Sequence, residues 1–333
     1  MSTTMKKNVQ KPQTQITTRV RSKKRVVAEW LFGLFSFVYF LFYWENNVVD
    51  VEVFETSDPR IPRELDGLTI VQVSDLHGKS FGRDNKKLLD KIRAWRPDLI
   101  AITGDLIDER DPNPDYARRT VDALKEIAPV FYVTGNHEGA FIKSLRDQIL
   151  DAIESAGAFM LEGVRVELSR GEDGALVVET LENDSERAPA PRSVLLAGIC
   201  DPKKTYASET SRTEPLWRES EIVDELLDEV PNDPNQYSIL LSHRPEQIRK
   251  YAKHKFDLVL TGHAHGGQFR FPLLLPNGLF APEQGYFPRY TSGRHVMGDT
   301  TEIVSRGLGP SVIPTRLFNR PCLVVCVLKT QEQ

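Results

Sequence analysis

The most constraining feature of the sequence is a set of five short apolar runs, each followed directly by a polar motif. The runs are Leu68–Val73, Leu99–Thr103, Val130–Thr134, Ser238–Leu241 and Leu258–Thr261. Runs of this length, rich in β-branched residues, predict strands that are buried on both faces. The intervening segments have a helical spacing of apolar residues, as at Leu88, Leu89, Ile92 and Trp95, and at Leu145, Ile149 and Ile153, with Gly157 as a helix stop. This alternation predicts an α/β fold with the polar motifs at one sheet edge.

The polar motifs supply side chains that bind metal ions. They contain Asp75, His77, Asp105, Asn136, His243, His263 and His265. Five of the seven histidines of the chain, His137 among them, fall in these motifs. A single histidine at a strand end is usually structural, but five beside two aspartates favour a metal site. Nitrogen and oxygen ligands without a thiolate suit Mn, Fe or Zn, and a carboxylate such as Asp105 can bridge two ions about 3.5–4 Å apart.

With these motifs in this order, the chain resembles the calcineurin-like metallophosphoesterases. The family pattern of D-x-H, G-D, G-N-H-[E/D], a lone His and G-H-x-H is present at 75–77, 104–105, 135–138, 243 and 262–265. The continuation to Lys329, with Gly266-Gly267-Gln268, Arg306–Gly309 and Arg320-Pro321, resembles the bacterial membrane-anchored branch of that superfamily. The resemblance implies two packed β-sheets flanked by helices instead of a single open sheet.

The resemblance also implies a role for each motif residue. One ion would be held by Asp75, His77, Asp105 and His265, and the other by Asp105, Asn136, His243 and His263, so that Asp105 bridges the two. A metal-activated hydroxide between two divalent ions would attack a phosphoester in line. His137 would act as general acid or stabilise the transition state, a task suited to an imidazole at neutral pH.

Several residues near the motifs keep two interpretations. Glu138 either supports the site from behind or is a surface charge. Gln268 and Arg270 follow the last motif closely enough to touch substrate. His254 is interpreted as a solvated helix residue, and His295 follows an irregular segment, 277–294, that could wall a pocket.

The N-terminal region predicts a membrane anchor. Residues 1–25 contain eight Lys/Arg and no Asp or Glu, and residues 26–44 form an apolar run with Trp30 and Trp44 near its ends. Such a run is long enough to cross a bilayer, and the basic arm would stay cytoplasmic, which places the rest of the chain across the membrane. The alternative is a buried helix of a soluble protein. No A-x-A site follows Trp44, so we expect an anchor that is not cleaved.

Composition limits the remaining choices. The net charge of −4 becomes −12 once the basic arm is set aside, which argues against nucleic acid as a partner. Cys200, Cys322 and Cys326 form no CxxC pair. The expected organisation is a basic arm (1–25), a transmembrane anchor (26–44), a linker with an edge strand at Val49–Phe54 (45–66) and the phosphoesterase domain (67–330). Residues 171–192 predict a hairpin with an exposed loop, and 201–220 a polar loop before a helix near Glu221–Val230.

Two classes of function follow. The first is a metal-dependent enzyme that hydrolyses phosphomonoesters or phosphodiesters, with a lipid-linked substrate such as a glycolipid pyrophosphate as one candidate because of the anchor. The second is a catalytically idle scaffold of the same fold that binds metal or a protein partner. An idle scaffold would be expected to lose ligands, and none is missing from the motifs.

Overall fold

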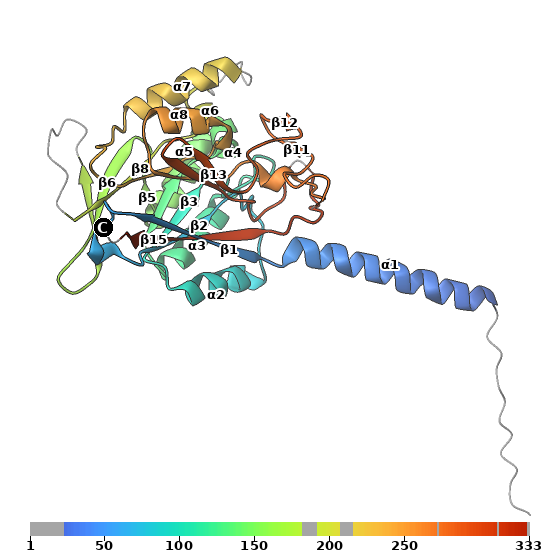
Figure 1. The fold of residues 1–333 in the computed structure, drawn as a ribbon. Coiled ribbons are helices and arrows are strands. Elements are labelled where there is room, and N and C mark those ends of the chain that lie inside the picture. The colour runs from blue at the N-terminus through green and yellow to red at the C-terminus, as the bar shows by residue number, and fades with distance from the viewer. Residues whose placement is uncertain (1–22, 182–191, 207–215, 272, 312, 332–333) are drawn as a thin grey trace, which may run out of the picture. The chain divides into compact units, whose positions relative to one another are not determined.

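The computed structural model describes residues 23–181, 192–206, 216–271, 273–311 and 313–331 (Figure 1). The chain divides into two units, Met1–Phe42 and Tyr43–Gln333. The first unit contains most of the helix α1 (Lys23–Asn47), whose large side chains from Trp30 to Trp44 are exposed. Within the described part of the chain, α1 is the one helix long and apolar enough to cross a membrane. It contains the predicted span of residues 26–44.

The second unit contains a six-stranded sheet in the order β1-β15-β2-β3-β4-β5. Its strands are β1 (Asp50–Asp58), β2 (Thr69–Val73), β3 (Leu99–Thr103), β4 (Val130–Val133), β5 (Phe159–Met160) and β15 (Cys322–Thr330). The helices α2 (Lys86–Trp95), α3 (Pro114–Lys125) and α5 (Lys143–Ser155) pack their apolar faces on one side of this sheet. Gly157, at φ +93°, follows the end of α5 as expected for a helix stop. The strand expected over Val49–Phe54 is β1, which lies at the sheet edge.

The second sheet has seven strands in the order β13-β14-β10-β9-β8-β6-β7. Its strands are β6 (Val164–Arg170), β7 (Leu176–Leu181), β8 (Val194–Gly198), β9 (Ser238–Leu241), β10 (Leu258–Thr261), β13 (Gly293–Met297) and β14 (Thr300–Val304). The helices α7 (Leu216–Asp228) and α8 (Ile248–Lys253) cover its outer face through residues such as Leu227 and Tyr251. The shorter elements are α4 (Asn136–Ala140), α6 (Pro202–Tyr206), β11 (Phe280–Ala281) and β12 (Gly285–Tyr286).

The main core lies between the two sheets. Ile70, Ala101 and Phe131 of the first sheet share a buried cluster with Leu196 and Ile239 of the second. Because each sheet buries both faces, its central strands are continuous apolar runs. The two-sheet fold flanked by helices is therefore confirmed.

Two loop predictions need correction. The polar loop predicted over 201–220 is wrong at both ends, because α6 occupies 202–206 and α7 begins at Leu216. The five residues of α6, Pro-Lys-Lys-Thr-Tyr, are too few to show a helical period. Of the predicted 171–192 hairpin, residues 171–175 turn from β6 into β7, whereas 182–191 lie outside the described residues.

Candidate metal centre

The predicted ligands lie just beyond the ends of β2, β3, β9 and β10 and at the start of α4. Five of them have left-handed backbone angles: φ is 50° at Asp75, 48° at His77, 53° at Asp105, 66° at His263 and 47° at His265. Such angles cost on the order of 1–3 kcal/mol for residues other than glycine and gather at functional sites. These backbone angles lower the stability of the fold, and they turn the five side chains toward one place.

Two glycines allow the ligand loops to approach one another closely. A Cβ atom on Gly104 would lie 2.6 Å from the Cα of Gly135 and from Nδ1 of His243. A Cβ atom on Gly262 would lie 1.9 Å from Oγ of Ser74 and 2.5 Å from Oδ2 of Asp75. A side chain at either position would push ligand-bearing loops apart. Glycine is therefore required directly before Asp105 and directly before His263.

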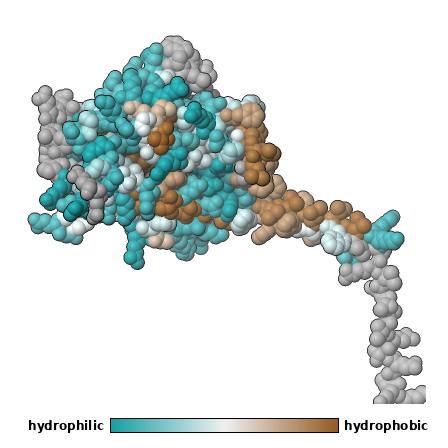
Figure 2. Space-filling model, in the orientation of Figure 1, coloured by the Kyte–Doolittle hydropathy of each residue, from teal (hydrophilic) through white to brown (hydrophobic). Residues whose placement is uncertain are grey.

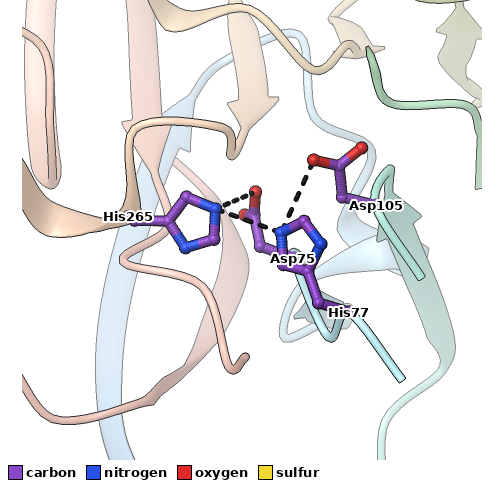
Figure 3. A group of neighbouring side chains, drawn as sticks. All are labelled: Asp75, His77, Asp105 and His265. Carbon is purple, nitrogen blue, oxygen red and sulfur yellow. Dashed lines mark hydrogen bonds and ion pairs between the residues drawn. The ribbon is translucent and has the colours of Figure 1, made fainter. Parts of the chain in front are cut away.

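The first ligand group is Asp75, His77, Asp105 and His265, all buried (Figure 3). Nε2 of His77 lies 3.1 Å from Nε2 of His265 and 3.6 Å from Oδ2 of Asp105. Nε2 of His265 lies 3.5 Å from Oδ1 of Asp75. Ligand atoms about 2.1 Å from one ion are about 3–3.5 Å apart at the usual angles, so these spacings fit a single cation.

The second group surrounds Nε2 of His243. This atom lies 3.1 Å from Oδ1 of Asn136, 3.2 Å from Nδ1 of His263 and 3.3 Å from Oδ2 of Asp105. The two groups therefore meet at Oδ2 of Asp105. The structure brings together all seven residues that the sequence singled out as ligands.

The hydrogen bond on the far side of His243 tests whether this group fits a cation. Nδ1 of His243 lies 2.7 Å from the carbonyl oxygen of Thr103, so Nδ1 carries a proton and donates it. In the neutral ring, Nε2 is then an acceptor that faces a carboxylate oxygen and an amide oxygen. Buried acceptors that converge without a donor are unfavourable, and a divalent cation satisfies all of them.

The charge states of the buried groups point the same way. Burial lowers the pKa of His77 to about 3 and the pKa of His265 well below its usual value, so both rings stay neutral and able to bind a metal. Burial also opposes charge on His243, but the carboxylates of Asp105 and Asp75 raise its pKa to about 10. The site thus draws positive charge to the junction of the two groups.

His137 is the most accessible imidazole of the cluster, with 19% of its side chain exposed. Its Nδ1 accepts a hydrogen bond from the backbone N–H of Glu109 at 3.0 Å. In the neutral ring the proton is therefore on Nε2, which lies 3.9 Å from Oδ2 of Asp105. This tautomer can donate a proton at the edge of the metal groups.

Glu138 supports the site from behind and is not a surface charge. It is fully buried, and its oxygens accept hydrogen bonds from the backbone N–H groups of Gly135, Asp105, Leu106 and Ile107 at 2.8–3.3 Å. Burial and the nearby Asp105 raise the pKa of Glu138 to about 7, although these N–H groups favour its charged form. Glu138 thereby holds together the two loops that carry Asp105 and Asn136.

A second buried network lies beyond His263. Nε2 of His263 pairs with Oε2 of Glu283, and Oε1 of Glu283 lies 3.2 Å from Nη1 of Arg244. Arg244 in turn holds Asp201 through two hydrogen bonds of 2.5 and 3.0 Å. A carboxylate on the outer nitrogen of a histidine fixes which nitrogen faces the metal. Here it leaves Nδ1 of His263 directed at His243.

Arg316 has the corresponding place beside His265. It is buried, its Nη2 lies 3.2 Å from Nδ1 of His265, and its other N–H groups donate to the carbonyl oxygens of Arg306 and Gly309. Because a guanidinium only donates, Nδ1 of His265 must accept. In the neutral ring the proton is then on Nε2. A neutral ring that held a metal through Nε2 would carry its proton on Nδ1 instead, so metal binding would require the Arg316 contact to change.

The other sequence candidates are engaged elsewhere. The amide of Gln268 donates to the carbonyl oxygens of Ile313 and Thr315, and Arg270 donates to Oγ of Ser292. His254 follows α8 and pairs with Asp224, and His295 lies on β13 with its ring edge-on to Tyr290. Substrate contact by Gln268 and Arg270 stays a prediction.

Sequence reasoning missed several members of the site. Asp108, whose oxygens lie 3.8 Å from His137 and 4.0 Å from His77, was marked only by its place three residues after Asp105. Arg244 directly follows His243, and this position next to a predicted ligand could have identified it. No local pattern indicated Asp201, Glu283 or Arg316, because each reaches the site from a distant loop.

Comparison with known proteins agrees with this geometry. The family model described as calcineurin-like phosphoesterase matches residues 68–267. The uncharacterized metallophosphoesterase YkuE of Bacillus subtilis is 27% identical over 86% of this chain and 88% of its own length. A transmembrane protein with metallophosphoesterase domain from Danio rerio is 25% identical over 85% of this chain and 57% of its own length.

A solved structure, a dimetal phosphatase from Danio rerio, aligns over 76% of this chain and 94% of its own, with 14% identity and a TM-score of 0.39. The classification rests on the family model, which covers all five strand-end motifs and more than half of the chain. The chain belongs to the calcineurin-like phosphoesterase family and is a metallophosphoesterase, a hydrolase of phosphoester bonds.

Proposed function

We propose that the protein is a membrane-anchored phosphoesterase that works with two divalent ions of Mn, Fe or Zn. One ion would be held by Asp75, His77, Asp105 and His265, and the other by Asp105, Asn136, His243 and His263. The observation that carries the proposal is that both groups converge on Oδ2 of Asp105. When bound, such ions activate water, clamp a phosphate and offset its developing negative charge.

The residues around the ions have separate tasks. Asp105 sets the spacing of the two groups, and Glu138 keeps the Asp105 loop against the Asn136 loop. His137 presents Nε2–H at the accessible edge and would donate that proton to the leaving oxygen of the substrate. Glu283 would keep the ring of His263 in a fixed orientation.

The anchor would place this site at a membrane surface. We propose that α1 spans the bilayer with its basic arm in the cytoplasm, since Lys and Arg stay on that side. The phosphoesterase domain would then be extracytoplasmic. Phosphomonoesters and phosphodiesters, including lipid-linked phosphoesters such as a glycolipid pyrophosphate, are the substrate classes that this arrangement favours.

The test is hydrolysis by the full chain in detergent, loaded with Mn²⁺, Fe²⁺ or Zn²⁺. Substrates should include an aryl phosphate, a diaryl phosphate and a nucleotide-linked lipid, and Asp105→Asn provides the inactive control. We expect turnover of at least one substrate that Asp105→Asn lacks. Absence of hydrolysis with every metal and substrate would favour the idle scaffold.

A further inference from the structure

The phosphoesterase domain exposes a group of large apolar side chains on two loops. We call Phe271, Leu273, Leu274, Phe287, Ile313 and Phe318 the apolar rim. Leu273 is 97% exposed, Leu274 83% and Phe287 70%, more than almost any other large apolar residue described outside α1. Figure 2 shows hydrophobic surface gathered over the loops that carry β11 and β12. Burying one such side chain is worth about 1.5–3 kcal/mol, so an exposed group of them indicates a partner.

The two loops are joined to each other and to the metal centre. The ring centroids of Phe271 and Phe318 lie 6.1 Å apart. The amide of Gln268 holds the carbonyl oxygens of Ile313 and Thr315 at 2.7 and 2.8 Å. The amide of Asn319 donates to the carbonyl oxygen of His265 at 2.7 Å. The apolar rim is thus built on the loop that carries a predicted metal ligand.

Within the Tyr43–Gln333 unit, the loop that bears Ile313 and Phe318 forms hydrogen bonds with the end of α1. Oδ1 of Asn46 accepts the backbone N–H of Arg316 at 2.7 Å, and Oε1 of Glu45 accepts that of Asn319 at 2.8 Å. The guanidinium of Arg320 lies 4.4 Å from the ring centroid of Trp44. The apolar stretch of α1 ends at Trp44, so a bilayer that holds α1 begins within a few residues of the loop that bears Ile313 and Phe318.

The charge around the rim suits a lipid surface. Residues 268–294 contain three arginines and one glutamate, whereas the chain after residue 25 has a net charge of −12. The glutamate is Glu283, which pairs with Arg244 and His263, whereas Arg289 is exposed two residues from Phe287. Apolar side chains beside exposed arginines are the composition that enters the interface of anionic bilayers.

We propose that the apolar rim inserts into the interfacial layer of the bilayer that α1 spans. The inference rests on the proposed anchoring by α1 and is independent of hydrolysis. A rim seated in the headgroup layer would hold the loop that carries His265 close to the membrane surface. The proposed partner of the rim is the bilayer itself. Trp44, Glu45 and Asn46, at the end of the apolar stretch of α1, contact the loop that bears Ile313 and Phe318.

The experiment uses the full chain in vesicles of phosphatidylcholine and phosphatidylglycerol. An environment-sensitive dye is attached to Leu274→Cys, and in a separate sample to Val177→Cys as the matched control. Val177 is also an exposed apolar residue (43%), but it lies on β7, at the opposite edge of the second sheet from β13. The native cysteines are buried and leave the new thiol as the labelling site.

We expect the Leu274 label to shift to the blue and to lose emission when the acyl chains are brominated, while the Val177 label does neither. The added change Leu273→Glu should reverse the shift, and its 97% exposure makes unfolding an unsuitable explanation. A Leu274 label that behaves like the Val177 label in floated vesicles would overturn the inference and leave the anchoring intact. A blue shift without quenching by brominated lipid would assign the rim to a second copy or another protein. A chain that does not float with the vesicles would contradict the anchoring and this inference together.

Discussion

Nε2 of His243 lies 3.3 Å from Oδ2 of Asp105, and both side chains are almost completely buried. Because Nδ1 of the same ring donates to Thr103, the neutral ring turns a lone pair toward a carboxylate. Burial opposes charge on His243, but without a metal Asp105 and Asp75 raise the pKa of His243 to about 10 and so favour a second proton on the ring. A divalent ion would supply this positive charge in place of the proton, so we expect the folded state to gain stability from metal. An ion present at about 100 times its Kd contributes about 2.7 kcal/mol.

We therefore expect chelation to lower Tm by roughly 5 °C or more. A change of about 1 kcal/mol in the free energy of unfolding moves Tm by roughly 2–4 °C in proteins of roughly 150–250 residues. The measurement is thermal unfolding of the full chain before and after chelator, followed by metal add-back. Asp105→Asn, which lacks the shared ligand, should show little response. Equal Tm values for treated and untreated protein would count against a metal centre.

His137→Ala should lower kcat by about 10²–10⁴-fold, the usual contribution of a general acid. Metal content should stay near that of the unmodified protein, because His137 lies outside the two predicted ligand sets. Steady-state kinetics and elemental analysis of the same preparation test both statements. Loss of metal together with activity would show that His137 is itself a ligand.

Glu138→Gln should lower the free energy of unfolding by about 2–3 kcal/mol. The amide NH₂ group would face backbone N–H groups that now donate to a carboxylate, which leaves buried donors unpaired. Glu109→Gln is the matched control, since Glu109 is exposed in the adjoining loop. Denaturant unfolding of the two variants should separate them clearly, and similar midpoints would refute the supporting role.

Glu283→Gln should weaken binding of one of the two ions by about 10–100-fold, the usual effect of removing a carboxylate behind a metal-bound histidine. The other ion, held through His265, should keep its affinity, because Arg316 and not Glu283 contacts that ring. Metal titration of the chelated protein should resolve the two sites. Glu172→Gln, an exposed change in the turn before β7, should leave both affinities unchanged.

The lowered pKa of Lys79 predicts a free energy of unfolding that rises with pH. Burial lowers its pKa from 10.5 to about 8, and Nζ of Lys79 donates to the carbonyl oxygen of Asn46. Between these values the unfolded chain binds more protons than the folded one, so the free energy of unfolding increases as pH rises from 8 to 10.5. Comparison of Tm between Lys79→Met and the unmodified chain over this range isolates the effect. A rise of equal size in both proteins would assign it to other groups.

Local sequence patterns were sufficient for the central strands. The runs at Leu99–Thr103, Ser238–Leu241 and Leu258–Thr261 match β3, β9 and β10 at both ends, because buried strands are short, apolar and β-branched. The gathering of the candidate ligands at one sheet edge followed from motifs at strand ends, whereas the grouping of His77 with His265 came from the resemblance to the phosphoesterases. Their assignment as ligands stays a prediction for metal analysis to test.

Other parts of the site had no local signature. Glu283 is recruited by Arg244, about 40 residues earlier in the chain, and Arg316 reaches His265 from a loop without a regular element. Such contacts depend on how distant loops pack, which no periodicity records. The loop predicted over 201–220 was wrong for a different reason, since the five residues of α6 are too few to show a helical period.

The pairing of β1 with β15 has a consequence for the order of folding. These two strands are parallel neighbours along their whole lengths, from Asp50 opposite Cys322 to Asp58 opposite Thr330, and β1 is hydrogen-bonded to no other strand of its sheet. The first strand after α1 must therefore wait for almost the entire chain before it finds its neighbour. Contacts so distant in sequence form slowly and leave an unpaired edge exposed meanwhile. Loss of the last ten or so residues would leave β1 without its partner strand, so damage at the carboxyl end of the chain would destabilise the strand that directly follows α1.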